Sequence, residues 1–238
     1  MMNKPMITIK HLLAFIIMLS NVNVFADGMV VDKVYHPYVI ANEQEFEWRF
    51  MSSQTPDSNV LAQRLGYGQS ILENFAVELY VIGERDETGD FKLQATEVEA
   101  RWMLTEQGQY WADWGVVFEF EKQRNISQYE ASAGLIVEKE FNKNSLTVNL
   151  FVIKEWGNNI ENEWEAEFRL QYRYRYLPSL QPSIEIYTGE DFIGIGPGFM
   201  GVKRFDGQKQ LKWEAGFITE VAHSGKNHTL RFSIEYEF

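Results

Sequence analysis

The chain ends in HTLRFSIEYEF, residues 228–238, in which every second side chain is apolar. Charged or hydroxyl side chains fill the places between them, and the last residue is aromatic. This alternation predicts a β-strand that turns one face to an apolar medium and the other to polar groups. The apolar face could meet the core of a soluble sandwich or the interior of a bilayer. Its members are Leu230, Phe232, Ile234, Tyr236 and Phe238.

The same period of two recurs from Asn42 to the C-terminus, and no stretch keeps a helical period with caps. The longest case is EWEAEFRLQYRYRY at 163–176, where apolar side chains alternate with glutamate, arginine and glutamine. Together with the terminal strand, this predicts twelve strands. The other ten lie near 43–50, 60–70, 75–81, 97–104, 114–120, 129–138, 146–152, 183–189, 199–205 and 211–221.

The connections between these strands form two alternating sets, which supports an even strand count with both chain ends on one side. Strands of roughly 9 to 13 residues are long for a soluble protein but fit a tilted crossing of a bilayer. Short turns are predicted at 71–74, 105–109, 141–144, 177–182 and 206–210. Loops are predicted at 53–60, 86–90, 122–128, 157–162, 189–198 and 223–227.

The N-terminus has the pattern of an export signal. Lys4 and Lys10 precede the apolar run LLAFIIMLS at 12–20, and small residues lead to a cleavage site after Ala26. The run is too short to span a bilayer as a helix. We therefore expect a cleaved signal peptide at 1–26, a short periplasmic segment at 27–41 and a barrel at 42–238.

Composition narrows the function classes. The formal net charge of −12 makes nucleic acid a poor partner. The chain has no cysteine, which excludes disulfides and a thiolate nucleophile. The export signal, the strand lengths, the aromatic content of 15% and the absence of cysteine together favour lipid over a soluble sandwich as the apolar medium. The sequence therefore predicts an all-β transmembrane barrel, antiparallel and up-and-down, of about twelve strands with both termini periplasmic.

The ending Leu230-x-Phe232-x-Ile234-x-Tyr236-x-Phe238 resembles the C-terminal signature of Gram-negative outer-membrane β-barrel proteins. The resemblance implies that this strand is an assembly signal read by the barrel-assembly machinery. It also implies a location in the bacterial outer membrane, in contact with its lipid and lipopolysaccharide. It does not extend to a solute.

The charged lumen of a barrel of this size is compatible with two functions. In the first, the lumen is a narrow passive channel for small hydrophilic solutes, and its excess of glutamate favours cations. In the second, the charges pair across the lumen and close it, leaving a structural or partner-binding role. A candidate selectivity patch combines the acids and bases of one strand, Glu163, Glu165, Glu167, Arg169, Arg173 and Arg175. A candidate constriction loop at 189–198 carries Phe192, Ile193, Ile195 and Pro197.

An outer-membrane lipid-modifying enzyme is a weaker third reading. Such enzymes place histidine and serine on one face of a strand, whereas His223 and Ser224 are adjacent and would point in opposite directions. His36 precedes the first strand. The histidines of the mature chain lie far apart, so we predict no catalytic residue, no metal site and no cofactor.

Overall fold

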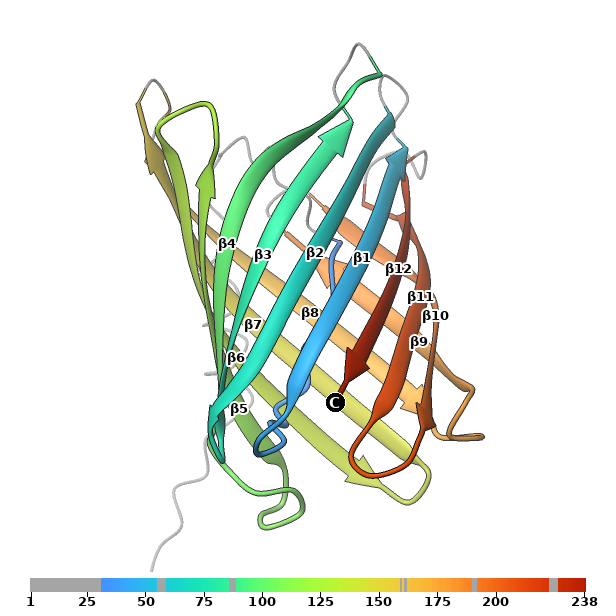
Figure 1. The fold of residues 1–238 in the computed structure, drawn as a ribbon. Helices are drawn as coiled ribbons and strands as arrows, with labels where there is room; N and C mark the ends of the chain where they lie inside the picture. The colour runs from blue at the N-terminus through green and yellow to red at the C-terminus, as the bar shows by residue number, and fades with distance from the viewer. Residues whose placement is uncertain are drawn as a thin grey trace, which may run out of the picture.

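The computed structural model describes residues 31–54, 59–85, 89–158, 160, 162–189, 192–222 and 227–238; the expected signal peptide at 1–26 lies outside them. These described residues form twelve strands (Figure 1). The strands are β1 (Gln44–Gln54), β2 (Asn59–Leu72), β3 (Phe75–Arg85), β4 (Phe91–Met103), β5 (Asp113–Gln123), β6 (Gln128–Phe141), β7 (Asn144–Gly157), β8 (Glu163–Tyr174), β9 (Gln181–Thr188), β10 (Ile193–Arg204), β11 (Gln210–Glu220) and β12 (His228–Glu237).

Each strand pairs antiparallel with the next in sequence, and β12 pairs with β1 to close the barrel. At the seam Phe50 lies opposite Phe232, and the rings of Phe46 and Phe238 stack with their centroids 5.7 Å apart. The amide of Phe238 donates to the carbonyl of Gln44 at 2.9 Å, so the terminal strand is bonded to its last residue. The closed antiparallel barrel and its strand count are as predicted.

The connections separate to the two ends of the barrel. The short turns lie at one end, and the start of β1 and the C-terminus lie at that same end (Figure 1). We call this the turn end and the opposite one the loop end. No helix among the described residues is long and apolar enough to cross a membrane.

One predicted loop is mostly strand. The stretch GIGPGFMG, residues 194–201, overlaps the loop predicted at 189–198 but belongs to β10. Pro197 in this stretch lies opposite Ile184 of β9. Its glycines reflect close packing of neighbouring chains: a Cβ on Gly196 would overlap the carbonyl oxygen of Phe217. Glycine and proline therefore indicated a loop where they in fact permit tight strand packing.

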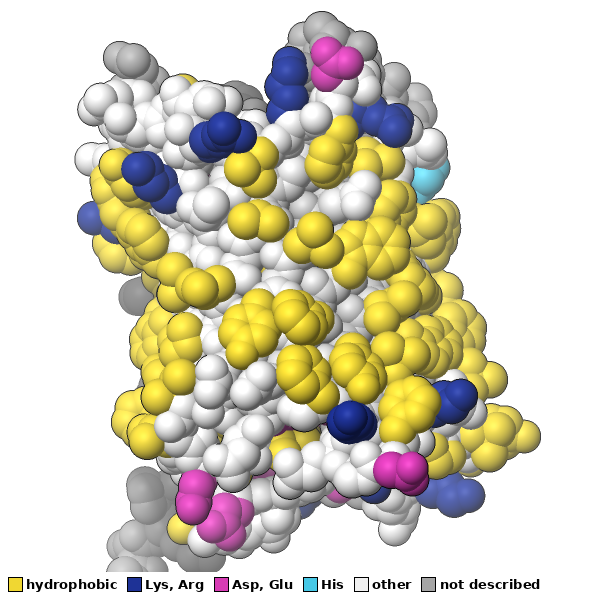
Figure 2. Space-filling model, viewed as in Figure 1, with side chains coloured by type: hydrophobic (Ala, Val, Ile, Leu, Met, Phe, Trp, Pro, Cys, Tyr) yellow, Lys and Arg dark blue, Asp and Glu magenta, His cyan; other side chains and the backbone are white. Residues whose placement is uncertain are grey.

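The outer face of the barrel is apolar, and the inner face is polar. Large hydrophobic side chains stay exposed along the strands; Leu65 is 58% exposed and Leu79 56%. They form a broad band around the visible face, with charged side chains toward its two ends (Figure 2). A surface of this kind is far larger than the apolar patches of soluble proteins and fits lipid.

Candidate functional site: the barrel lumen

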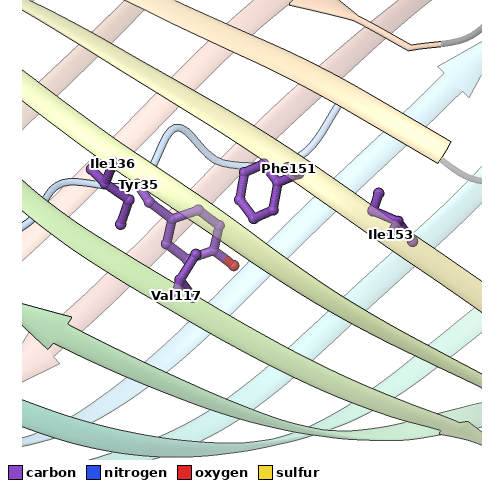
Figure 3. Close-up of a cluster of buried hydrophobic side chains, with 5 residues drawn as sticks. All are labelled: Tyr35, Val117, Ile136, Phe151 and Ile153. Carbon is purple, nitrogen blue, oxygen red and sulfur yellow. The ribbon is translucent and has the colours of Figure 1, made fainter. Parts of the chain in front are cut away.

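The lumen is occupied by the N-terminal part of the described chain. Residues 31–41, which we call the lumenal plug, run inside the barrel before the chain enters β1 (Figures 1 and 3). Val34 and Tyr35 are both 0% exposed, although neither belongs to a strand. The segment expected at 27–41 in the periplasm thus lies, from Val31 onward, among the inward-facing side chains. The physical reason is that its polar groups find partners there.

Main-chain groups of the plug bind polar side chains of the barrel wall. Asn149 of β7 accepts a hydrogen bond from the amide of Tyr35 at 2.7 Å and donates one to its carbonyl at 2.9 Å. The Asn149 side chain thereby satisfies the two groups that a neighbouring strand would otherwise bond. Arg169 of β8 donates to the carbonyl of Lys33 at 2.9 Å.

Charged side chains of the plug pair with β1. Asp32 lies 3.1 Å from Arg49, and Lys33 lies 3.2 Å from Glu47. Arg49 also contacts Glu47 at 2.9 Å and donates to the hydroxyl of Tyr80 at 2.9 Å. We call these five residues the paired cluster. Each of them is at most 7% exposed, so the charges depend on one another for solvation.

Tyr35 anchors the middle of the plug. Its hydroxyl lies between two carboxylates, 2.8 Å from Glu99 and 2.7 Å from Glu119. Its ring belongs to a small apolar cluster inside the barrel with Val117, Ile136, Phe151 and Ile153 (Figure 3). A single hydroxyl donates one hydrogen bond, so the second contact is a hydrogen bond only when one of the two carboxyls carries a proton and donates it to the tyrosine oxygen.

The lower part of the plug leads to the turn end. Nδ1 of His36 lies 2.6 Å from Glu138, and the hydroxyl of Tyr38 donates to Asp113 at 2.9 Å. Gly115 makes room for the chain, because a Cβ there would lie 3.0 Å from Pro37. The chain then turns at Asn42, which takes a left-handed conformation with φ of 61°.

Five glutamates lie side by side at the level above Tyr35, toward the loop end. Glu97 lies opposite Glu121, which lies opposite Glu130. Glu130 lies opposite Glu155, which in turn lies opposite Glu163. We call this set, on the five consecutive strands β4 to β8, the carboxylate row. Opposed side chains of a sheet have Cβ atoms about 5 Å apart, so the carboxylates repel one another unless cations or protons lie between them.

A cation is bonded at one end of the row. Arg64 of β2 lies 2.9 Å from Glu97. Glu121 accepts a hydrogen bond from the neutral Gln123 at 2.9 Å. The inward-facing glutamates of β4 to β8 thus follow one another across neighbouring strands, with Arg64 at one end.

The predicted selectivity patch divides into groups with different partners. Glu163 belongs to the carboxylate row, and Glu165 lies two residues further along the same inward face. Glu167 and Arg169 pair with each other at 2.7 Å, while Arg169 also binds the plug. The last two arginines bind acids of β6: Arg173 lies 3.1 Å from Glu138, and Arg175 contacts Glu140.

The residues of the predicted constriction loop lie at the loop end. Phe192 packs against an apolar cluster of Val31, Val34, Tyr187 and Ile218, so it contacts the start of the plug. Ile193, Ile195 and Pro197 are in β10, and both isoleucines are exposed on the outer face. Phe192 thus lies against the lumen, whereas these isoleucines do not.

Two further groups bear on the predictions. The carboxylates of Glu43, Glu45 and Glu237 lie within 4.8 Å of one another at the turn end, but Lys212 contacts Glu237. This acidic cluster is therefore part of an ion-pair network. His223 and Ser224 lie outside the described residues.

The residues that hold the plug, above all Asp32, Tyr35 and Asn149, were not predicted from the sequence. One signal was present: VYHPYV at 34–39 is too apolar and aromatic for a segment expected to lie in water. Inward-facing glycines such as Gly115 were a second signal, because side chains of that size leave space in a lumen.

Comparison with known proteins supports the fold. No family model matches the chain, and no curated protein matches it. A solved KdgM porin matches with a TM-score of 0.54 and 14% identity, covering 82% of this chain and 99% of the porin. KdgM porin in complex with disordered oligogalacturonate gives 0.53 and 13%, with the same coverage. Omp33 of Acinetobacter baumannii gives 0.49 and 8%, covering 84% and 99%. The KdgM matches are evidence of a shared barrel fold alone.

Proposed function

We propose that the protein is a narrow outer-membrane channel for small hydrophilic solutes, with a preference for cations, and that the lumenal plug closes it in this structure. The carboxylate row carries the proposal. It sets glutamates of neighbouring strands side by side on the inner face of the barrel, on the loop-end side of the bond between Tyr35 and Glu99. A fixed acidic wall concentrates cations in a narrow aqueous space and repels anions.

The orientation follows the sequence resemblance. The turn end, with the C-terminal strand, faces the periplasm, and the loop end faces the exterior. The strand ending at Phe238 would then also serve as the assembly signal. A passive channel requires no catalytic step.

The solute of the similar porin does not transfer to this chain. KdgM porin has been solved with disordered oligogalacturonate. Each galacturonate unit carries a carboxylate, so such a chain would meet the carboxylate row with like charge. Small cations and cationic solutes are favoured instead.

A closed barrel with a structural role is the second candidate, and the paired cluster favours it. Glu47 and Arg49 are at most 4% exposed, which is typical of a filled interior. The two candidates differ in what removal of the plug does. A filled barrel stays closed because its wall side chains still meet, whereas a plugged channel opens.

Planar-bilayer conductance separates them. The refolded chain 27–238 is compared with a chain that begins at residue 42, and a chain that begins at residue 31 is the matched control. We expect the variant without the plug to give discrete current steps at least about tenfold more often than either longer chain. If the plug-free barrel is folded by circular dichroism and passes no current above bare lipid, the channel proposal fails and the closed barrel stands.

A further inference from the structure

The outer face of the barrel has a groove on β6, β7 and β8, on the other side of the wall from the lumen. Its volume is about 360 Å³. Two alanines, Ala131 and Ala133, form an outward-facing floor of small side chains. Val152, Lys154, Trp156 and Trp164 form the rest of the outward lining. A long apolar chain fits this shape, because small side chains flanked by large ones leave a trough.

Lys154 lines this groove, and a second lysine, Lys122, lies beside it on the neighbouring strand β5. The ammonium of Lys154 is 5.1 Å from the ring centroid of Trp164 and 5.9 Å from that of Trp156. On β5, the ammonium of Lys122 is 6.0 Å from the ring centroid of Tyr129. At these distances the face of an aromatic ring attracts the ammonium group. The side of the ammonium that points away from the ring stays available to an anion.

The groove lining adds no carboxylate to these two cations. Glu121 and Glu155, the sequence neighbours of the lysines, lie on the inward face in the carboxylate row. A lysine on the lipid face of a barrel is costly at the bilayer midplane and tolerated at the headgroup level. Lys154 lies three residues before the end of β7, so it is at the level of the lipid headgroups.

The spacing of the lysines indicates two anions rather than one. Lys122 lies opposite Tyr129 of β6, and Lys154 lies opposite Ala131 of the same strand. Two strand spacings and a two-residue offset place their Cα atoms roughly 12 Å apart. A lipid whose disaccharide headgroup carries a phosphate at each end presents anions at a separation of this order.

We propose that this groove binds one molecule of a bisphosphorylated glycolipid of the outer leaflet. One acyl chain lies over Ala131 and Ala133, and the two phosphates meet Lys122 and Lys154. This proposal rests on two parts of the proposed function, the location of the barrel in the outer membrane and its orientation there. It does not rest on conduction through the lumen. A barrel that proves closed could still bind the lipid, and a channel could lack the site.

Native mass spectrometry of the refolded barrel tests the site with three lipids: bisphosphorylated lipid A, its monophosphorylated form and phosphatidylglycerol. We expect one copy of bisphosphorylated lipid A to be retained in preference to the other two. The double variant Lys122→Gln with Lys154→Gln should weaken that binding roughly tenfold or more. Ala133→Phe, which fills the groove and keeps both charges, should weaken it as well.

The matched control is the double variant Lys139→Gln with Lys203→Gln. Both lysines are on outward-facing positions at the turn end, and Lys203 also lies over an aromatic ring, that of Phe205, at 5.4 Å. The control should bind lipid A as the unmodified barrel does. Equal losses in the two double variants would overturn the site, as would no loss in either. Equal retention of phosphatidylglycerol would overturn the glycolipid as its occupant.

Discussion

The paired cluster and the carboxylate row use the same side chain in opposite ways. In the paired cluster Glu47 is enclosed by Lys33, Arg49 and the hydroxyl of Tyr80, within 3.2 Å of each. In the carboxylate row Glu130 lies opposite a glutamate on each neighbouring strand. The first arrangement holds a segment in place, whereas the second sets acidic side chains opposite one another, which is unfavourable wherever both are charged. The difference separates the part of the lumen that fastens the plug from the part to which we assign the ion preference of the proposed channel.

The largest expected effect comes from breaking the paired cluster. Arg49→Met leaves Asp32 and Glu47 buried without their guanidinium, so we expect the free energy of unfolding to fall by about 3–5 kcal/mol. Urea unfolding in lipid vesicles, followed by tryptophan fluorescence, measures it. Glu130→Gln is the control at a row position and should cause no such loss. An Arg49→Met barrel as stable as the unmodified one would mean that the cluster does not hold the plug.

A smaller effect is expected from the contact that binds the plug backbone. Asn149→Leu keeps the side-chain volume but removes both hydrogen bonds to Tyr35. The lost bonds weaken plug binding by about 1–3 kcal/mol, so we expect channel openings to become roughly tenfold more frequent.

Single-channel recording measures the opening frequency. Gln63→Leu is the matched control, because Gln63 is a partly exposed amide that accepts a hydrogen bond from Trp48 on the outer face. An unchanged opening frequency in Asn149→Leu, or an equal rise in Gln63→Leu, would show that the bonds to the plug backbone do not keep the channel closed.

The smallest effect has the opposite sign. Glu121→Gln removes charge from a position with a glutamate opposite on either side, so the free energy of unfolding should rise by about 0.2–1 kcal/mol for each repulsive pair removed. The same urea titration detects it. A clear loss of stability would show that Glu121 is held by attraction and that the row is a second paired cluster.

The strands were predictable because alternation follows from backbone geometry. The strand expected at 163–176 is observed as Glu163–Tyr174, and the seam between β12 and β1 forms at the stretch that ends the chain. In the GIGPGFMG stretch, the glycine and proline content led to the wrong prediction of a loop. Glycine and proline are as compatible with a crowded strand as with a loop, and only the neighbour, here Phe217, distinguishes them.

The site was less predictable, because alternation tells which side chains face inward and not what they meet. The acidic lumen was foreseen, but the alignment of Glu97, Glu121, Glu130, Glu155 and Glu163 depends on the register of four strand pairs. The plug was missed because its partners are distant in sequence, 14 residues away for Lys33 and Glu47 and 114 residues away for Tyr35 and Asn149. The periodicity of hydrophobic residues along a short segment carries no information about such a contact.

The reversal potential of the plug-free barrel in a potassium chloride gradient tests the role of the carboxylate row most directly. The comparison is between the barrel that begins at residue 42 and the same barrel with Glu130→Gln, Glu155→Gln and Glu163→Gln. We expect a reversal potential on the cation-selective side for the first and a shift toward zero for the second. A value that is anion-selective in the first, or identical in both, would contradict the claim that the carboxylate row sets the ion preference of this channel.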